Sequence, residues 1–343
     1  MRLLILTQKV DVKDSALGFF HNWIKEFSKK FETLEVICLQ KGMSDLPENV
    51  FVHSLGKEEG RSRIKYIWRF YRYIWQRRKQ YDAVFVHMNQ EYVLLGGLFW
   101  RLWGKKVIFW YNHTRGGILT KIAMFLSSLV CHTSPFAFTA GTKKSVKMPA
   151  GIDTKIFKQN LEIQRNSHKI LYVGRIAPAK KVHVLIDAVE ILNKEGIDFT
   201  LNIYGEALPK DQDYLKKLKE TSFDIRDKKV FFHGAVPNIE TPKIFNSHLI
   251  AVNLTAKGNY DKSVLEAAVC GAIPLVSSEA FKDILPEELF FKEDDSQDLA
   301  EKIKMVINME DGEREKLRLI LRKNVEENES LGKLAHIFFS LYS

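Results

Sequence analysis

Two cations, a carboxylate and an expected helix start mark the part of this sequence that can do chemistry. Arg175 and Lys180 follow the apolar run 169–173, and Glu266 lies in an apolar segment that begins at Ser263. The first N–H groups of a helix point at whatever fills the preceding loop, and with nearby cations they favour an anion. These residues therefore predict a site for a phosphate or a pyrophosphate.

Glycines follow the strand-like runs in the same part of the chain. Gly174, Gly205, Gly234 and Gly258 stand where the backbone must turn tightly or approach a ligand. Ligands of open α/β sheets bind outside the carboxyl ends of the strands, so these loops are expected to line one site. Dinucleotide-binding dehydrogenases and P-loop enzymes are disfavoured, because no strand is followed by Gly-x-Gly-x-x-Gly and no Gly-x-x-x-x-Gly-Lys-Ser/Thr occurs.

The elements that must hold these residues alternate between strand-like runs and amphipathic segments. This alternation predicts parallel sheets with crossover helices, and it restarts at residue 169 after a polar stretch. A chain of 343 residues also exceeds the usual size of one domain. We therefore predict two doubly wound, Rossmann-like α/β domains, residues 1–149 and 150–330, with residues 331–343 packing back on the first.

Positive charge is concentrated in the first half of the chain. Residues 1–150 have a net charge of +13 and residues 151–343 a net charge of −3. Cations interleave with aromatics in residues 61–79, which can lie as a helix on an anionic membrane surface. An equally weighted interpretation is that an apolar stripe packs on a sheet while the cations are solvated; the stripe is Ile64, Ile67, Phe70, Tyr71 and Ile74. Nucleic acid ranks lowest, because no recognition module accompanies the charge.

The cysteines and the apolar runs indicate the compartment. Cys38, Cys131 and Cys270 lie far apart in apolar segments, as reduced core thiols of a cytosolic protein do. No run is long enough to span a membrane, and residues 1–7 suit a buried strand better than a signal peptide. We expect a cytoplasmic protein that is peripheral on the inner face of the membrane.

Five blocks of the sequence resemble glycosyltransferase family 4, whose members are retaining enzymes of the GT-B fold. Gly174-Arg175 with Lys180, followed by residues 184–188, resembles one of the family's blocks. The other four blocks agree in order and spacing: residues 151–157, 203–205, 231–236 and 266–276. Together they cover most of residues 148–285, whereas the first half resembles the family only through its strand pattern and residues 110–113.

The resemblance implies a nucleotide-diphospho-sugar bound by the second domain and an acceptor bound by the first, across a cleft. Arg175 and Lys180 match the family's pair that binds the diphosphate and stabilises it as it leaves. Glu266 matches the glutamate that accepts hydrogen bonds from the ribose. The remaining candidates for donor binding are Gly18, Gly174, Gly205, Gly234, Val236, Tyr260, Asp261, Lys262 and Ser263.

Several of these residues have a second interpretation. Ser263 and Glu266 also have the spacing of a capping box, in which the glutamate bonds back to the helix start. His113 can hydrogen-bond to hydroxyls of the donor or acceptor, or serve as a structural histidine. Glu91 is a candidate for acceptor binding or for a catalytic base, and His87 is expected to face the same cleft. Gly18 marks either an approach to the diphosphate or only tight packing.

Two positions depart from the family pattern. Gly258 stands where the family has a glutamate that contacts the donor sugar, so the resemblance does not identify the sugar. Asp261 and Lys262 are candidates to make the sugar contacts in place of that glutamate. Lys181 stands where the family has glycine, and it either adds charge near the phosphates or points to solvent. No cofactor or metal is expected, since a helix start explains the acidic pair Asp211 and Asp213.

These observations predict a metal-independent, retaining hexosyltransferase that uses a UDP- or GDP-sugar and a glycan or lipid-linked acceptor. One alternative is a GT-B epimerase acting on a nucleotide sugar, which product analysis without an acceptor would reveal. The other is a catalytically silent protein that binds a sugar nucleotide or an anionic surface, suggested by Gly258. Hydrolysis of a nucleotide-sugar donor would count against a catalytically silent protein.

Overall fold

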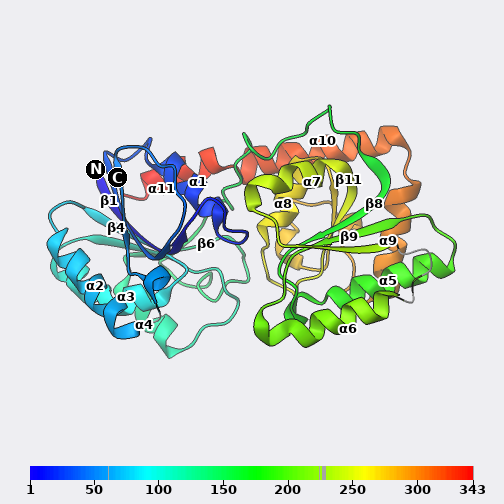
Figure 1. Ribbon diagram of the computed structural model, residues 1–343. Coiled ribbons are helices and arrows are strands. Elements are labelled where there is room, and N and C mark those ends of the chain that lie inside the picture. Colours follow the sequence, from blue (N-terminus) through cyan, green and yellow to red (C-terminus); the bar gives the residue numbers. More distant parts are fainter. Residues whose placement is uncertain (61, 224, 226–228, 343) are drawn as a thin grey trace. The chain divides into compact units, whose positions relative to one another are not determined.

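The computed structural model describes residues 1–60, 62–223, 225 and 229–342, and these form two compact units (Figure 1). The first unit contains Met1–Gly151, Pro237–Ile239 and the segment from Leu331 onward. The second contains Ile152–Val236 and Glu240–Ser330. The chain thus leaves the first unit after Gly151, contributes Pro237–Ile239 to it, and returns to it at Leu331.

The first unit is built on a parallel sheet with the order β3-β2-β1-β4-β5-β6-β7. Both faces are covered by helices, so its central strands are continuous apolar runs rather than alternating ones. Leu3, Leu4, Ile5 and Leu6 of β1, for example, are all fully buried. The strands are β1 Arg2–Val10, β2 Thr33–Lys41, β3 Val50–Ser54, β4 Ala83–His87, β5 Lys106–Trp110, β6 Leu129–His132 and β7 Ser145–Lys147.

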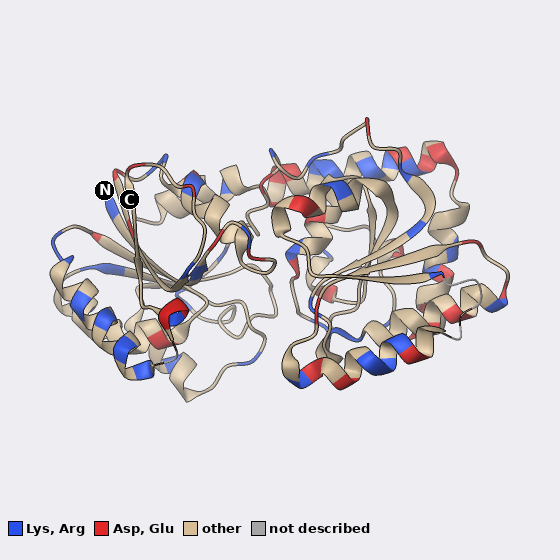
Figure 2. Ribbon diagram, in the orientation of Figure 1, with Lys and Arg blue, Asp and Glu red and all other residues tan. Residues whose placement is uncertain are grey.

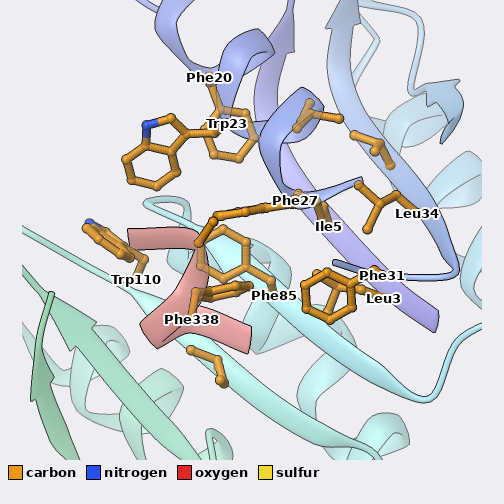
Figure 3. Packing of buried hydrophobic residues seen from close by; sticks show 14 of the residues in the cluster. Leu3, Ile5, Phe20, Trp23, Phe27, Phe31, Leu34, Phe85, Trp110 and Phe338 are labelled. Carbon is orange, nitrogen blue, oxygen red and sulfur yellow. The ribbon is translucent and has the colours of Figure 1, made fainter. Parts of the chain in front are cut away.

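Two helices from opposite ends of the chain cover one face of this sheet. Helix α1 (Gly18–Phe27) lies beside α11 (Leu331–Ser340). Figure 3 shows Phe338 of α11 among the aromatic rings of the core, and it stacks on Phe27 with a centroid separation of 4.7 Å. This burial ties the C-terminal segment to the first unit.

The other face of the sheet is covered by α2 (Arg63–Gln76), α3 (Gln90–Leu102) and α4 (Ile118–Leu126). The expected apolar stripe of α2 is only partly correct. Phe70 and Ile74 are buried against the sheet, but Ile64 and Ile67 are 84% and 43% exposed. The helix therefore packs through a narrower stripe than predicted and leaves apolar side chains in solvent. Arg61, the first cation of the expected basic segment, lies outside the described residues.

The second unit has a five-stranded parallel sheet with the order β10-β9-β8-β11-β12. The chain starts in the middle at β8, moves outward to β10 and then crosses to β11, so the winding direction changes between β8 and β11. Such a switch point is where ligands of doubly wound sheets bind. The strands are β8 Asn166–Val173, β9 Thr200–Tyr204, β10 Val230–Gly234, β11 His248–Asn253 and β12 Ile273–Val276.

The helices of the second unit pack as two groups. The first group is α5 (Val182–Lys194), α6 (Gln212–Phe223) and α9 (Ser296–Asn308), and the second is α7 (Thr241–Ser247), α8 (Lys262–Val269) and α10 (Asp311–Asn328). Figure 1 shows the two groups on opposite faces of the sheet. The unit is therefore doubly wound, as the sequence predicts.

Two further expectations concern membranes and thiols. Within the described ranges, no helix is long and apolar enough to cross a membrane. Cys38, Cys131 and Cys270 are buried free thiols, as expected. Burial raises the pKa of the Cys38 and Cys270 thiols to about 12, which leaves them protonated and unreactive at neutral pH.

Candidate functional site

Three of the predicted glycines join the carboxyl ends of β8, β9 and β10. The Gly174 N–H donates to the Tyr204 carbonyl at 3.0 Å, and the Gly205 N–H donates to the Gly234 carbonyl at 2.7 Å. A Cβ atom at Gly205 would lie 1.8 Å from the Gly174 oxygen, and its φ of +152° also favours glycine. The strand ends therefore depend on glycine for their close approach. Val236, another predicted donor residue, is half-buried in the loop after Gly234.

The loop after β8 presents the two predicted cations. Arg175 is exposed, and the Tyr172 hydroxyl holds its backbone by donating to the Arg175 carbonyl at 3.0 Å. Among the described residues no carboxylate pairs with the Arg175 guanidinium. Lys180 ends a short 3-10 turn, Pro178–Lys180, and is half-buried. A fixed loop with an uncompensated cation is suited to an anionic ligand.

Asp261 connects this loop to the start of α8. Its Oδ2 atom lies 2.6 Å from Lys180 Nζ and accepts a hydrogen bond from Asn253 Nδ2 at 3.0 Å. Asp261 is the N-cap residue of α8, yet its side chain makes no capping hydrogen bond to the helix. The carboxylate is thus turned toward Lys180, and it does not occupy the first N–H groups of α8. Lys180, Asp261 and this helix start lie together at the switch point.

The expected helix start at Ser263 is wrong. Helix α8 begins at Lys262, after the N-cap Asp261, so Ser263 lies inside the first turn. The capping-box interpretation of Glu266 fails for the same reason, because a capping box needs its serine at the N-cap. Its match to the ribose-binding glutamate is unaffected.

Lys262 and Glu266 belong to a charged cluster that sequence reasoning only partly found. Glu266 and Glu329 are 6% and 5% exposed. Burial lowers the pKa of Lys262, while the negative charges of Glu266 and Glu329 oppose that shift. Burial and a hydrogen bond to Glu329 raise the pKa of Tyr260. Glu329, directly after α10, is thus hydrogen-bonded to Tyr260 and acts electrostatically on Lys262, the first residue of α8, and no local spacing in the sequence indicated this.

The structure explains the two departures from the family pattern. Gly258 has a φ of +90°, a conformation that strains an L-residue such as glutamate. Lys181 forms ion pairs with Glu293, at 2.6 Å, and with Asp294. Glu293 also accepts a hydrogen bond from the Lys257 N–H at 3.0 Å, which holds the loop before Gly258. Lys181 therefore anchors a neighbouring loop, and it neither points freely to solvent nor lies unpaired beside the switch point.

The predicted residues His113 and Glu91 lie in the first unit. His113 is in the exposed loop after β5, where its ring packs edge-on against Tyr111 at 5.1 Å and desolvation lowers its pKa. Glu91 is exposed in the first turn of α3 and borders a cavity. Both side chains are accessible, and a neutral imidazole at His113 can accept or donate a hydrogen bond.

His87 and Gly18 occupy more structural positions. The His87 ring is buried and stacks on Phe20 with a centroid separation of 4.2 Å, so it forms part of the aromatic core. Gly18 is the first residue of α1, and its N–H donates to the Asp14 carbonyl at 3.1 Å. The Asp14 side chain in turn accepts a hydrogen bond from Lys9 Nζ at 2.6 Å. A Cβ atom at Gly18 would lie 3.2 Å from the Val12 carbonyl oxygen, so the backbone packs closely here, and an approach of Gly18 to the diphosphate stays a prediction.

Over the residues that the structure describes, no group of three or more His, Cys, Asp and Glu side chains is arranged to hold a metal ion. Asp211 lies in a 3-10 turn, and Asp213 lies in the first turn of α6, where acidic residues favour the helix start. The absence of a metal requirement stays a prediction.

One protein-family model matches the sequence. It is described as glycosyl transferases group 1 and matches residues 167–309, the region from β8 to α9 that contains Arg175, Lys180, Asp261 and Glu266. No curated protein matches the sequence.

Solved structures resemble the whole chain. HepE of Anabaena, in complex with UDP and glucose, has a TM-score of 0.77 at 16% identity and covers 100% of this chain and 99% of its own. A glycosyltransferase of Rickettsia africae gives 0.78 at 15% identity, with 99% and 98% covered. Sucrose-phosphate synthase of Thermosynechococcus elongatus gives 0.74 at 14% identity, with 100% and 98% covered. At these identities the likeness shows the fold, and it confirms the predicted GT-B fold.

The family model and the structural likeness concern different aspects of the chain. The model matches the residues of the predicted donor site, whereas the likeness extends over both units. The family model supports a glycosyltransferase, the enzyme class that the sequence predicts, and the structural likeness shows the fold. The narrower assignment to family 4 stays a prediction.

Proposed function

We propose that the protein transfers a hexose, with retention of its anomeric configuration, from a UDP- or GDP-sugar to a glycan or lipid-linked acceptor. The observation that carries the proposal is the meeting of Lys180, Asp261 and the start of α8 at the switch point, beside the loop of Arg175. A leaving diphosphate gains negative charge in the transition state, and fixed cations stabilise that charge. Solved HepE complexes contain UDP and UDP-glucose, which favours uridine as the base.

Each residue then has a distinct task. Arg175 and Lys180 bind the diphosphate, and the N–H groups at the start of α8 donate to it. As the diphosphate attracts Lys180, Asp261 is released from its ion pair and becomes an acceptor for a sugar hydroxyl. That role replaces the glutamate for which Gly258 leaves no strain-free place. Glu266 accepts hydrogen bonds from the ribose.

Calorimetry with UDP and GDP tests the donor site. Arg175→Ala removes charge-assisted hydrogen bonds worth about 1.5–3 kcal/mol, so the dissociation constant should rise by about ten- to a hundredfold. Lys194→Ala is the control, because Lys194 is 72% exposed and pairs with Glu190 on α5. The proposal fails if neither nucleotide binds to the wild type. It also fails if Arg175→Ala, like the control Lys194→Ala, binds the nucleotides as tightly as the wild type does.

We also propose that the first unit associates with an anionic membrane surface from the cytoplasmic side. Figure 2 shows Lys and Arg along α2, and Ile64, Trp68 and Trp75 of this helix are 84%, 59% and 53% exposed. Arg72 lies over the Trp68 ring at 5.4 Å, so cation and aromatic ring form one amphipathic surface. Apolar and cationic side chains of this kind bind the headgroup region of acidic bilayers.

Flotation with vesicles that contain phosphatidylserine tests this association. Arg72→Glu combined with Arg78→Glu should abolish flotation, since each cation near the surface contributes about 1 kcal/mol and each substitution also adds repulsion. Lys216→Glu with Lys217→Glu on α6 is the charge-matched control and should float like the wild type. Equal flotation of both double variants would contradict membrane binding through α2 and the turn that follows it.

A further inference from the structure

A cavity of about 350 Å³ lies in the first unit, at the carboxyl ends of its strands. Its walls come from the ends of β2 and β3 and from the facing sides of α2 and α3, and they include Leu39, Leu55, Ile67, Phe70 and Leu95. The volume falls within the range of small-molecule sites. None of the donor-site residues lines this cavity; all of them lie in the second unit except Gly18, which is in the first unit but outside the cavity lining.

Gln8, Asn89 and Glu91 are the polar side chains of the cavity lining apart from two tyrosines. Asn89 Nδ2 donates to Gln8 Oε1 at 2.6 Å, so these two amides partly satisfy each other. Glu91 is exposed, and its carboxylate can accept hydrogen bonds from hydroxyl groups. Glu91 is therefore the lining residue best suited to the hydroxyl groups of a sugar.

The two tyrosines that line the cavity add little polar capacity. The Tyr66 hydroxyl donates to the Gly60 carbonyl at 2.6 Å, and the Tyr92 hydroxyl donates to the Thr7 carbonyl at 3.4 Å. A free glycan that filled the cavity would therefore bury most of its hydroxyls against apolar walls, at about 1–3 kcal/mol for each unpaired group. An apolar chain has no such penalty.

The wall formed by α2 connects the cavity to the apolar surface of the first unit. Ile67 lines the cavity and is also 43% exposed, between the exposed Ile64 and Trp68. From residue 92 to residue 152 the sequence contains no Asp or Glu, and α2 contains none either. The surroundings of the cavity are thus apolar and cationic, as suits an acceptor held at an acidic lipid surface.

We infer that this cavity holds the apolar chain of an amphiphilic acceptor, a sugar attached to an alkyl or isoprenoid chain, with the sugar hydroxyls at Glu91. The inference rests on the proposed function, and it selects the lipid-linked acceptor over the free glycan. The chain fills the apolar part of the cavity, and the carboxylate of Glu91 accepts a hydrogen bond from the sugar.

Binding of alkyl glucosides without any nucleotide tests this assignment. Methyl, hexyl and octyl β-glucoside would be titrated calorimetrically below their micellar concentrations. Burial of two further methylene groups should make octyl glucoside bind about tenfold more tightly than hexyl glucoside. Methyl glucoside should bind most weakly. Equal affinity for the three glucosides would overturn the inference.

Matched variants separate the cavity from the exposed apolar surface. Leu95→Gln places a polar group in the cavity wall and should weaken octyl glucoside about tenfold. Leu98→Gln changes the same residue type on the same helix, but Leu98 is 58% exposed and lies outside the wall, so affinity should be unchanged. If Leu95→Gln does not fold, Ile67→Gln with Ile64→Gln as its control replaces the pair. Equal losses within a pair would refute the cavity as the binding site.

The glucoside titrations and the UDP titrations test the cavity and the donor site separately. If UDP binds but the affinity for the glucosides does not depend on their chain length, the acceptor inference is refuted and the proposed donor site is unaffected. If the affinity depends on chain length but UDP does not bind, the cavity is supported and the donor site is refuted. In turnover, a lower KM for octyl than for methyl glucoside that disappears in Leu95→Gln would support the cavity as the acceptor site.

Discussion

Asp261→Asn should make the protein bind UDP more tightly. The Asp261 carboxylate lies 2.6 Å from Lys180 Nζ, and it also accepts a hydrogen bond from Asn253. A diphosphate must compete with this carboxylate for Lys180 and is repelled by its charge. The asparagine side chain retains an oxygen for the Asn253 bond and removes the charge.

The expected gain follows from the exposure of the pair. The side chains of Lys180 and Asp261 are 23% and 29% exposed, so solvent screens their attraction and the pair lies at the upper end of the range for surface ion pairs, about 1 kcal/mol. Releasing Lys180 should therefore lower the dissociation constant of UDP about fivefold. The gain should shrink at high salt, because the competing interactions are electrostatic.

Calorimetric titration of UDP, which has no sugar to contact Asp261, measures this effect. Lys180→Ala should weaken the binding of UDP. Adding Asp261→Asn to Lys180→Ala should lower the dissociation constant of UDP by clearly less than fivefold, because no lysine remains to be released. Glu293→Gln is the matched control: Glu293 pairs with Lys181 at the same 2.6 Å, and UDP affinity should not change. Unchanged or weaker UDP binding by Asp261→Asn would refute the competition between carboxylate and diphosphate.

Three further predictions concern stability. Gly205→Ala should lower the midpoint of thermal unfolding and weaken UDP, because its Cβ would lie 1.8 Å from the Gly174 oxygen; Gly312→Ala, with open space around it, should do neither. Phe338→Ala should lower the free energy of unfolding by about 3–5 kcal/mol in a urea titration, and a loss below 1 kcal/mol would contradict the packing of α11. Burial lowers the pKa of His248 to about 4, so the unfolded chain binds the proton more tightly. The contribution of His248 to the free energy of unfolding should be complete above pH 6.5, and the free energy of unfolding should fall by about 2 kcal/mol between pH 7 and pH 5. If the free energy of unfolding of His248→Gln falls equally over this range, His248 is not the cause.

The sequence locates best those elements that have a regular apolar pattern. The apolar runs 83–87 and 273–276 coincide with strands β4 and β12, and the amphipathic segment 182–194 coincides with helix α5. Helix α4 was not expected, and Ile118, Leu119 and Phe125 explain why. These apolar side chains are 76%, 56% and 68% exposed, so the helix shows no simple pattern of buried and solvated faces. The same effect made the apolar stripe of α2 misleading.

The candidate site also contains features that the sequence predicts and features that it does not. The glycines and cations after β8, β9 and β10 were predictable because a strand followed by Gly or Gly-Arg is a local pattern. The ion pair of Lys180 with Asp261 and the influence of Glu329 on Lys262 join segments that lie far apart in sequence. The start of α8 was misplaced because Ser263 is a favourable N-cap residue, whereas the side chain of Asp261 is engaged by Lys180 and Asn253.

The release of UDP from UDP-hexoses in the presence of octyl glucoside tests the central claim most directly. Wild-type protein should release UDP and form a glycoside whose anomeric configuration, read by NMR, equals that of the donor. Arg175→Ala should reduce the rate by about a hundredfold or more, and Lys194→Ala should leave it unchanged. An inverted product would refute retention. Equal rates for wild type and Arg175→Ala, or no release of UDP or GDP from any nucleotide sugar, would contradict the proposed donor site.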